Sequence, residues 1–203
     1  MDNKDYLEHP ICDTDIWVNL CLGDSLKEFF NLHPIIFIAD VVGNEIMKWK
    51  NSGNAAIAEE FIKYRDNKNV VVIYYNKDIL SEDRPILEQQ LREIGFSAGF
   101  SKPDKNKGEF VSAIYADYLA IPYMKTNDNA FQEGGFGAKK FPDLEIRNWN
   151  DTLRNVIVDD KKRLQISKKV EQERSLMDRR NEKHKEQELE EKINQLKQKF
   201  SRR

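Results

Sequence analysis

Short apolar segments alternate with helical segments along the first three quarters of the chain, and this alternation limits the possible folds. The clearest apolar segment, "IIFIAD" (35–40), is typical of a strand covered on both faces of a parallel sheet. Similar strands are expected at 10–12, 70–75, 119–124 and 144–149. Helices are expected between them at 16–30, 41–50, 55–64, 78–94 and 109–120. This order predicts an α/β fold with a mainly parallel sheet.

Charge divides the chain into an acidic body and a basic tail. Residues 1–150 contain 17 Lys and Arg against 24 Asp and Glu, whereas residues 151–203 contain 16 against 11. The resulting net charges of −7 and +5 sum to the −2 of the whole chain. A length of 203 residues is enough for one domain with a core and an appendage. We therefore expect a domain over 1–155 and a charged helical tail over 156–203.

Cysteine and histidine are too few for a disulfide framework or a zinc site. The cysteines are Cys12 and Cys21, and His9, His33 and His184 show no ligand spacing with them. The first residues are polar and acidic, unlike a signal peptide, and no apolar run approaches the roughly 18 residues of a membrane span. We therefore expect a soluble, cytoplasmic protein with no membrane partner.

Four acidic residues are expected at one edge of the predicted sheet. They are Asp13 at the end of the first strand, Glu45 after the second, Glu109 before the fourth and Asp128 after the fourth. Ligands of open parallel sheets bind outside the carboxyl ends of the strands. Each acid alone has an ordinary explanation, as a helix-dipole stabiliser or a turn residue. Together they would repel one another unless a cation compensates, and carboxylate oxygens suit Mg²⁺ or Mn²⁺.

The motifs that contain these acids resemble those of a known family. "ICDTDIW", "ADVVGNEI", "KGEFVSAIYADYLA" and "YMKTNDNAF", in this order, are similar to segments of the PIN domain, a family that includes the VapC-type toxin ribonucleases. The matching positions are Asp13-Thr14, Glu45, Gly108-Glu109 and Thr126-Asn127-Asp128, and "FPDLEIRNW" resembles the family's last strand. The resemblance covers roughly residues 10–155 and implies a three-layer α/β/α domain.

The resemblance also implies a metal-dependent endoribonuclease that cleaves RNA phosphodiesters. Asp13, Glu45, Glu109 and Asp128 would be the catalytic residues and would hold one or two Mg²⁺ or Mn²⁺ ions. Such ions can activate a water and stabilise the charge that develops on a phosphodiester. Thr14 and Thr126 would support the ligands by donating hydrogen bonds, and Asp15 would join the site as an additional acid beside them. For a toxin-type member, the implied partners are RNA and an inhibitory antitoxin protein.

Two other interpretations stay open. Asp13-x-Asp15 after a strand also resembles the first motif of haloacid-dehalogenase-type phosphatases, in which the first Asp is a nucleophile and the second a general acid/base. The late Gly-Asp-x-x-x-Asp pair of that family is not found, because Gly23-Asp24 comes too early in the chain. The third interpretation is a non-catalytic module that binds RNA or a protein partner on a PIN-like scaffold.

The basic tail is expected to be helical, because it has no Gly or Pro from residue 155 onward and is rich in Lys, Arg, Glu and Gln. A 4-3-4 spacing of Leu189, Ile193, Leu196 and Phe200 suggests a short coiled coil that could join two copies of the chain. The basic residues nearest to the domain are expected to contact RNA phosphates: Lys161, Lys162, Arg163, Lys168 and Lys169. The alternative is a solvated, partly frayed helix.

Overall fold

The parallel sheet predicted from the sequence is present. The computed structural model of the 203-residue chain describes residues 5–96, 99–100, 104 and 106–201. Within these residues the strands are β1 (Ile11–Cys12), β2 (Ile36–Ala39), β3 (Val70–Ile73), β4 (Tyr123–Lys125) and β5 (Glu145–Arg147). They form one sheet in the order β3-β2-β1-β4-β5, and every pairing is parallel. The expected α/β class is therefore confirmed, with β1 at the centre of the sheet.

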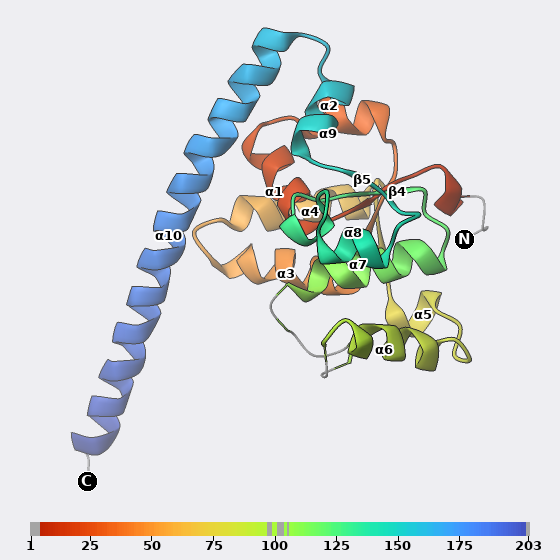
Figure 1. Cartoon of the computed structure of the whole chain (residues 1–203). Coiled ribbons are helices and arrows are strands. Elements are labelled where there is room, and N and C mark those ends of the chain that lie inside the picture. Colours follow the sequence, from red (N-terminus) through yellow and green to blue (C-terminus); the bar gives the residue numbers. More distant parts are fainter. Residues whose placement is uncertain (1–4, 97–98, 101–103, 105, 202–203) are drawn as a thin grey trace.

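Helices follow the strands in the alternation that a parallel sheet requires (Figure 1). They are α1 (Thr14–Leu22), α2 (Leu26–Leu32), α3 (Asp40–Met47), α4 (Ala55–Asp66), α5 (Tyr75–Asp78), α6 (Arg84–Glu93), α7 (Lys107–Tyr118), α8 (Phe136–Lys140), α9 (Trp149–Val156) and α10 (Asp160–Ser201). Short 3₁₀ helices are η1 (Asp5–Leu7), η2 (Lys48–Asn51) and η3 (Asn129–Phe131). Among the described residues, no helix is both long enough and apolar enough to span a membrane.

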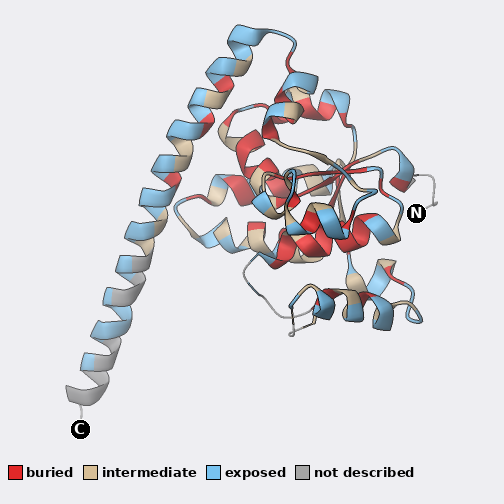
Figure 2. Ribbon diagram, viewed as in Figure 1, coloured by how far each residue is buried: buried red, intermediate tan, exposed pale blue. Residues whose placement is uncertain are grey.

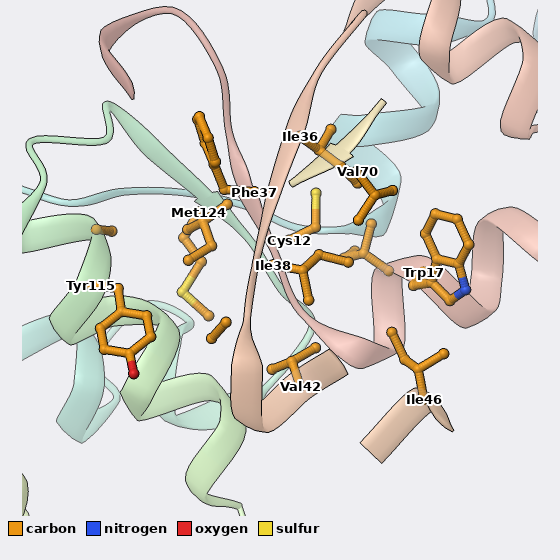
Figure 3. Packing of buried hydrophobic residues seen from close by; sticks show 14 of the residues in the cluster. Cys12, Trp17, Ile36, Phe37, Ile38, Val42, Ile46, Val70, Tyr115 and Met124 are labelled. Carbon is orange, nitrogen blue, oxygen red and sulfur yellow. The ribbon is translucent and has the colours of Figure 1, made fainter. Parts of the chain in front are cut away.

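Helices cover both faces of the sheet. On one face Trp17 of α1 packs edge-on against Phe30 of α2 and Phe61 of α4. On the other face Tyr115 of α7 lies on the side of the sheet that carries Phe37 (Figure 3). The residues of β2 between these layers, Ile36–Ala39, are fully buried, which explains why "IIFIAD" has almost no polar residue. The arrangement is consistent with a three-layer α/β/α fold.

Some expected boundaries were wrong, and turn chemistry explains them. The helix expected at 16–30 is divided into α1 and α2, because Gly23 ends α1 and Asp24 takes a left-handed conformation with a φ of 50°. The strand expected at 119–124 begins only at Tyr123, since the turn after α7 uses a φ of 54° at Ala120. The helix expected at 78–94 is likewise interrupted between α5 and α6.

Helix α10 is 42 residues long, and its first half packs on the body of the domain. Ile166, Val170 and Met177 are buried there, at successive spacings of four and seven residues that keep them on one side of the helix. Asn181 accepts a 2.7 Å hydrogen bond from Asn54 at the start of α4. Figure 2 shows that buried residues occur along this half, whereas the described side chains beyond it are mostly exposed.

The spacing expected for a coiled coil falls at the far end of this helix. Ile193 is exposed, with 41% of its surface accessible. The side chains of Leu189, Leu196 and Phe200 lie outside the described part of the structure. The pairing of two helices through this seam therefore stays a prediction.

Two glycines beneath α10 provide a matched test of its docking. A Cβ added at Gly23 would lie 2.9 Å from a methyl carbon of Ile166 and 3.0 Å from the carbonyl oxygen of Asn19. A Cβ added at Gly53 would meet only Arg180, at an ordinary contact distance of 3.5 Å. We therefore expect Gly23→Ala to loosen α10 and Gly53→Ala to leave it docked.

Hydrogen exchange of the α10 amides and limited trypsin cleavage within 161–180 measure this difference. Overpacking costs roughly 1 to 3 kcal/mol, so exchange in Gly23→Ala should be at least several-fold faster than in Gly53→Ala. Equal protection of α10 in the two variants would show that the helix is not held by this contact.

Candidate active site

Asp13 lies where the central strand meets the first helix. It follows β1 directly and caps α1, with only 1% of its surface exposed. One carboxylate oxygen accepts a 2.6 Å hydrogen bond from the backbone N–H of Thr14, and the other accepts a 3.1 Å bond from the hydroxyl of Thr126. Burial raises the pKa of Asp13 well above its usual range, and the nearby charges of Glu109 and Asp15 raise it further. A proton or a cation would stabilise this carboxylate.

Thr126 connects Asp13 to Asp128. Its hydroxyl donates to Asp13 and accepts a 3.1 Å hydrogen bond from the backbone N–H of Asp128. The carboxylate of Asp128 caps η3 by accepting a 2.7 Å bond from the N–H of Ala130. Because β4 lies next to β1 in the sheet, the end of β4 places these two acids at the same sheet edge. Thr126 is fully buried, so this connection is shielded from water.

Glu45 reaches the same edge from α3. One of its carboxylate oxygens accepts a 2.8 Å hydrogen bond from the hydroxyl of Thr14, the residue after Asp13. The side chain also passes close to the start of α7, where a Cβ at Gly108 would lie 3.3 Å from a Glu45 oxygen and 3.1 Å from a methyl carbon of Val42. A glycine at position 108 therefore gives the Glu45 carboxylate room between α1 and α7.

Glu109 follows this glycine in the first turn of α7. Burial raises its pKa from 4.5 to about 7, and repulsion from Asp128, Glu45 and Asp15 adds to the effect. These charges act on Glu109 because all of them lie near the same edge of the sheet. The structure thus brings the four acids expected from the sequence into one neighbourhood.

None of the four acids forms an ion pair with a Lys or Arg of the described residues. The nearest lysine in sequence to Thr126 is Lys125, but consecutive strand residues point to opposite faces of a sheet. The Lys125 amine lies over the ring of Phe29 and 3.4 Å from the hydroxyl of Thr152. Burial lowers its pKa to about 8. The positive charge of Lys125 therefore does not compensate the negative charges of the four carboxylates.

Asp15 differs from the four other acids, because it has a basic partner. Arg174 of α10 donates hydrogen bonds to the Asp15 carboxylate at 3.2 Å and to the side-chain oxygen of Asn19 at 2.7 Å. The Asp15 side chain is about half exposed. It lies at the border of the site and connects the site to α10.

A groove borders Glu45 and Glu109, and we call it the α3–α7 groove. Its volume is about 610 Å³. Its lining consists of Thr14, Asp15, Glu45, Lys48, Trp49, Asp104, Asn106 and Glu109. Lys48 and Trp49 were not expected as site residues from the sequence. They follow Glu45 by three and four positions, a spacing that places side chains on one side of a helix and could have indicated them.

The donor atoms of the site suit a hard divalent cation such as Mg²⁺ or Mn²⁺, since all four side chains are carboxylates. As they stand, however, no three His, Cys, Asp or Glu side chains of the described residues are placed to hold a metal ion together. Hydrogen bonds explain this spacing, because Asp13, Glu45 and Asp128 each direct an oxygen to a hydroxyl or amide of the protein. Binding a cation would require these side chains to move from the positions described here.

Of the basic residues expected to contact RNA, some form ion pairs within the protein and others do not. Lys162 pairs with Glu28 at 2.8 Å, Lys169 pairs with Asp24, and Arg163 binds Asp160 and the carbonyl oxygens of Ile157 and Val158. Lys161 and Lys168 are exposed and have no ion-pair partner among the described residues. Three of the five side chains thus hold α10 and its approach to the domain, and their contact with RNA stays a prediction.

The raised pKa of Glu109 predicts how stability depends on pH when no divalent cation is added. Between pH 4.5 and about 7 the folded state binds a proton that the unfolded state has released. Stability should therefore fall as the pH rises through this window, by about 1 to 3 kcal/mol after allowance for solvent screening. Asp13 acts in the same direction.

Urea unfolding in EDTA at several pH values between 4.5 and 8 tests this expectation. Glu109→Gln should flatten the pH dependence, since an amide does not titrate. Asp117→Asn is the matched control, because Asp117 is an exposed acid on the same helix. If Glu109→Gln and the wild type lose stability equally with rising pH, then Glu109 does not titrate in this window.

Comparison of the chain with protein-family models, with curated proteins and with solved structures found no match. Its own side chains therefore carry any assignment of function. They form a set of carboxylates, Asp13 buried and the other three partly buried, at the carboxyl edge of a parallel sheet beside an open groove, and none of them pairs with a Lys or Arg of the described residues.

Proposed function

We propose that this chain is a PIN-like, Mg²⁺- or Mn²⁺-dependent endoribonuclease. The observation that carries the proposal is the convergence of Asp13, Glu45, Glu109 and Asp128, from four separate segments, without a basic partner among the described residues. Placing acids together at a partly buried edge costs stability, because like charges repel, and here Glu109 raises the pKa of Asp13 while Asp128 and Glu45 raise the pKa of Glu109. Such an arrangement is expected where it serves a function.

Two threonines support the proposal, because they orient the acids without neutralising them. Thr14 donates to Glu45, and Thr126 donates to Asp13. Each hydroxyl fixes one carboxylate oxygen and leaves lone pairs free for a ligand. Hydrogen bonds of this kind hold ligating carboxylates in position in metal sites.

Asp13, Glu45, Glu109 and Asp128 would hold the cation. When bound, it would supply the activation of water and the stabilisation of charge on the phosphodiester. Its positive charge would also lower the pKa of Glu109 and Asp13, so that both stay ionised at neutral pH. The groove beside Glu45 and Glu109 gives a polymer access to this edge from solvent.

The sequence resemblance supports RNA as the substrate. The four acids follow the order of the PIN motifs that the sequence resembles, and Gly108, at the position of the family's Gly-Glu pair, leaves room for the Glu45 carboxylate. A phosphatase mechanism would need Asp15 as an acid/base beside Asp13. The carboxylate of Asp15 instead accepts a 3.2 Å hydrogen bond from Arg174 of α10, so it is engaged in a contact at the border of the site.

Replacing Asp13 or Asp128 by Asn tests the proposal directly. Each change removes a charged ligand and keeps the side-chain shape, so divalent-cation-dependent cleavage of single-stranded RNA should fall by about 100-fold or more, as expected for the loss of several kcal/mol of charge stabilisation. The melting temperature in EDTA should stay the same or rise, because repulsion is relieved. Cleavage of labelled RNA at several Mg²⁺ and Mn²⁺ concentrations is the measurement.

Asp117→Asn again serves as the control and should cleave like the wild type. The proposal fails if the Asp13→Asn, Asp128→Asn double variant cuts RNA at the wild-type rate. Hydrolysis of small phosphate monoesters that is lost on Asp13→Asn would instead support the phosphatase interpretation.

A further inference from the structure

One wall of the α3–α7 groove is chemically unlike the rest. Half of its lining residues are acidic, namely Asp15, Glu45, Asp104 and Glu109, but η2 contributes the cationic side chain of Lys48 and the indole of Trp49. The negative charges of the groove repel a polyanion. The positive charge of Lys48 and the aromatic ring of Trp49 could offset this repulsion and bind a polyanion in the groove. They reach the groove from the turn directly after α3, the helix that carries Glu45.

Trp49 differs from the two other tryptophans of the chain. Trp17 is fully buried, stacks edge-on against three rings, and donates its indole N–H to the carbonyl oxygen of Ile57. Trp149 is also buried. Trp49 packs partly against the core but lines the groove, and among the described residues it neither stacks on a ring nor donates a hydrogen bond. Part of a large aromatic surface thus remains available to a ligand.

The side chain of Lys48 is also available to a ligand. It is exposed and forms no ion pair with a described residue, although Glu45 precedes it by three positions. Some surface lysines are held by acids, since Lys140 pairs with Glu93 and Lys162 with Glu28, whereas Lys48 is held by no acid of the described residues. The amine of Lys48 can therefore bind an anion without breaking a contact within the protein.

The turn that carries Trp49 is well anchored. The carbonyl oxygen of Trp49 accepts hydrogen bonds from the backbone N–H and the hydroxyl of Ser52, at 3.0 and 2.9 Å. The same hydroxyl accepts a 3.2 Å bond from the N–H of Asn54, which is buried and binds Asn181 of α10. Helix α10 thus secures the far side of the turn. An aromatic side chain held this way loses little entropy when it binds a ligand.

We propose that Trp49 and Lys48 bind single-stranded RNA beside the carboxylates, with the indole stacked on one nucleobase and the amine on a neighbouring phosphate. This inference rests on the proposed nuclease function and names its substrate as unpaired RNA, because a base can stack on a side chain only when its face is free. The groove volume of about 610 Å³ falls within the range of about 300 to 1,000 Å³ that is usual for ligand pockets. Stacking tolerates all bases, so little sequence preference follows from it.

Binding is measured in EDTA, where cleavage does not interfere, with a mixed-sequence single-stranded RNA of about ten nucleotides, a length within the site sizes of single-strand binders. Intrinsic fluorescence should be quenched on binding, since Trp49 is the tryptophan that lines the groove.

Trp49→Leu should weaken binding by about 5- to 100-fold, the cost of one lost base stack. Trp49→Phe should keep most of the affinity but lose the quenching. Lys48→Gln should lower the salt slope of log affinity by about 0.7.

Tyr74 and Lys77 provide matched controls, because they form an exposed aromatic–lysine pair outside the groove, with the Lys77 amine 4.9 Å from the ring centre. Tyr74→Leu and Lys77→Gln should bind RNA like the wild type. The inference is overturned if Trp49→Leu, with an unchanged melting temperature, binds as tightly as the wild type. It is also overturned if a blunt RNA duplex binds as tightly as the single strand and with the same dependence on Trp49.

These outcomes are separate from those for the nuclease. If Trp49→Leu binds normally while Asp13→Asn abolishes cleavage, the binding surface is wrong and the nuclease stands. If the Trp49 and Lys48 variants lose binding but the wild type cleaves no RNA with Mg²⁺ or Mn²⁺, the groove binds single strands and the nuclease proposal fails.

Discussion

A buried carboxylate at the end of the shortest strand organises this molecule. β1 has only two residues, yet it pairs with β2 on one side and β4 on the other, so whatever follows it lies at the middle of the sheet edge. Asp13 occupies that place and starts α1. Its two hydrogen bonds connect the start of α1 to the end of β4 through Thr126. Glu45 and Glu109 then approach this fixed point from α3 and α7.

The sequence predicted the middle of the sheet well because β2 and β3 are short, continuous apolar segments, as strands buried in a parallel sheet are. β2 and the start of α3 at Asp40 were predicted almost to the residue, since the apolar run ends where the polar residue begins. The divisions at Gly23 and Ala120 were missed. Both depend on left-handed backbone turns, which Ala120 does not signal at all and which Asp24 signals only as one of many acidic residues of the chain.

The site was predictable to the extent that it follows from strand ends. Asp13 and Asp128 belong to adjacent strands, so parallel pairing alone brings them to one edge. The roles of Trp49 and Arg174 were not predictable in this way. Trp49 lines a groove whose opposite wall comes from α7, and Arg174 reaches Asp15 from 159 residues away. Such contacts depend on how distant segments pack together, and no sequence pattern shared by these segments indicates the contact. Lys162 and Lys169 illustrate the same limit, because a basic residue looks identical in sequence whether or not an acid faces it.

The position of α10 has a consequence for the order in which the chain is completed during synthesis. All five strands lie within residues 11–147, so the sheet and the four carboxylates can assemble before α10 has left the ribosome. Until then the surface of α1 around Gly23 stays uncovered, and Asp15 has no arginine beside it. The last quarter of the chain can therefore dock on a body that is already folded, so that the acidic edge can be complete before its outer helix is in place.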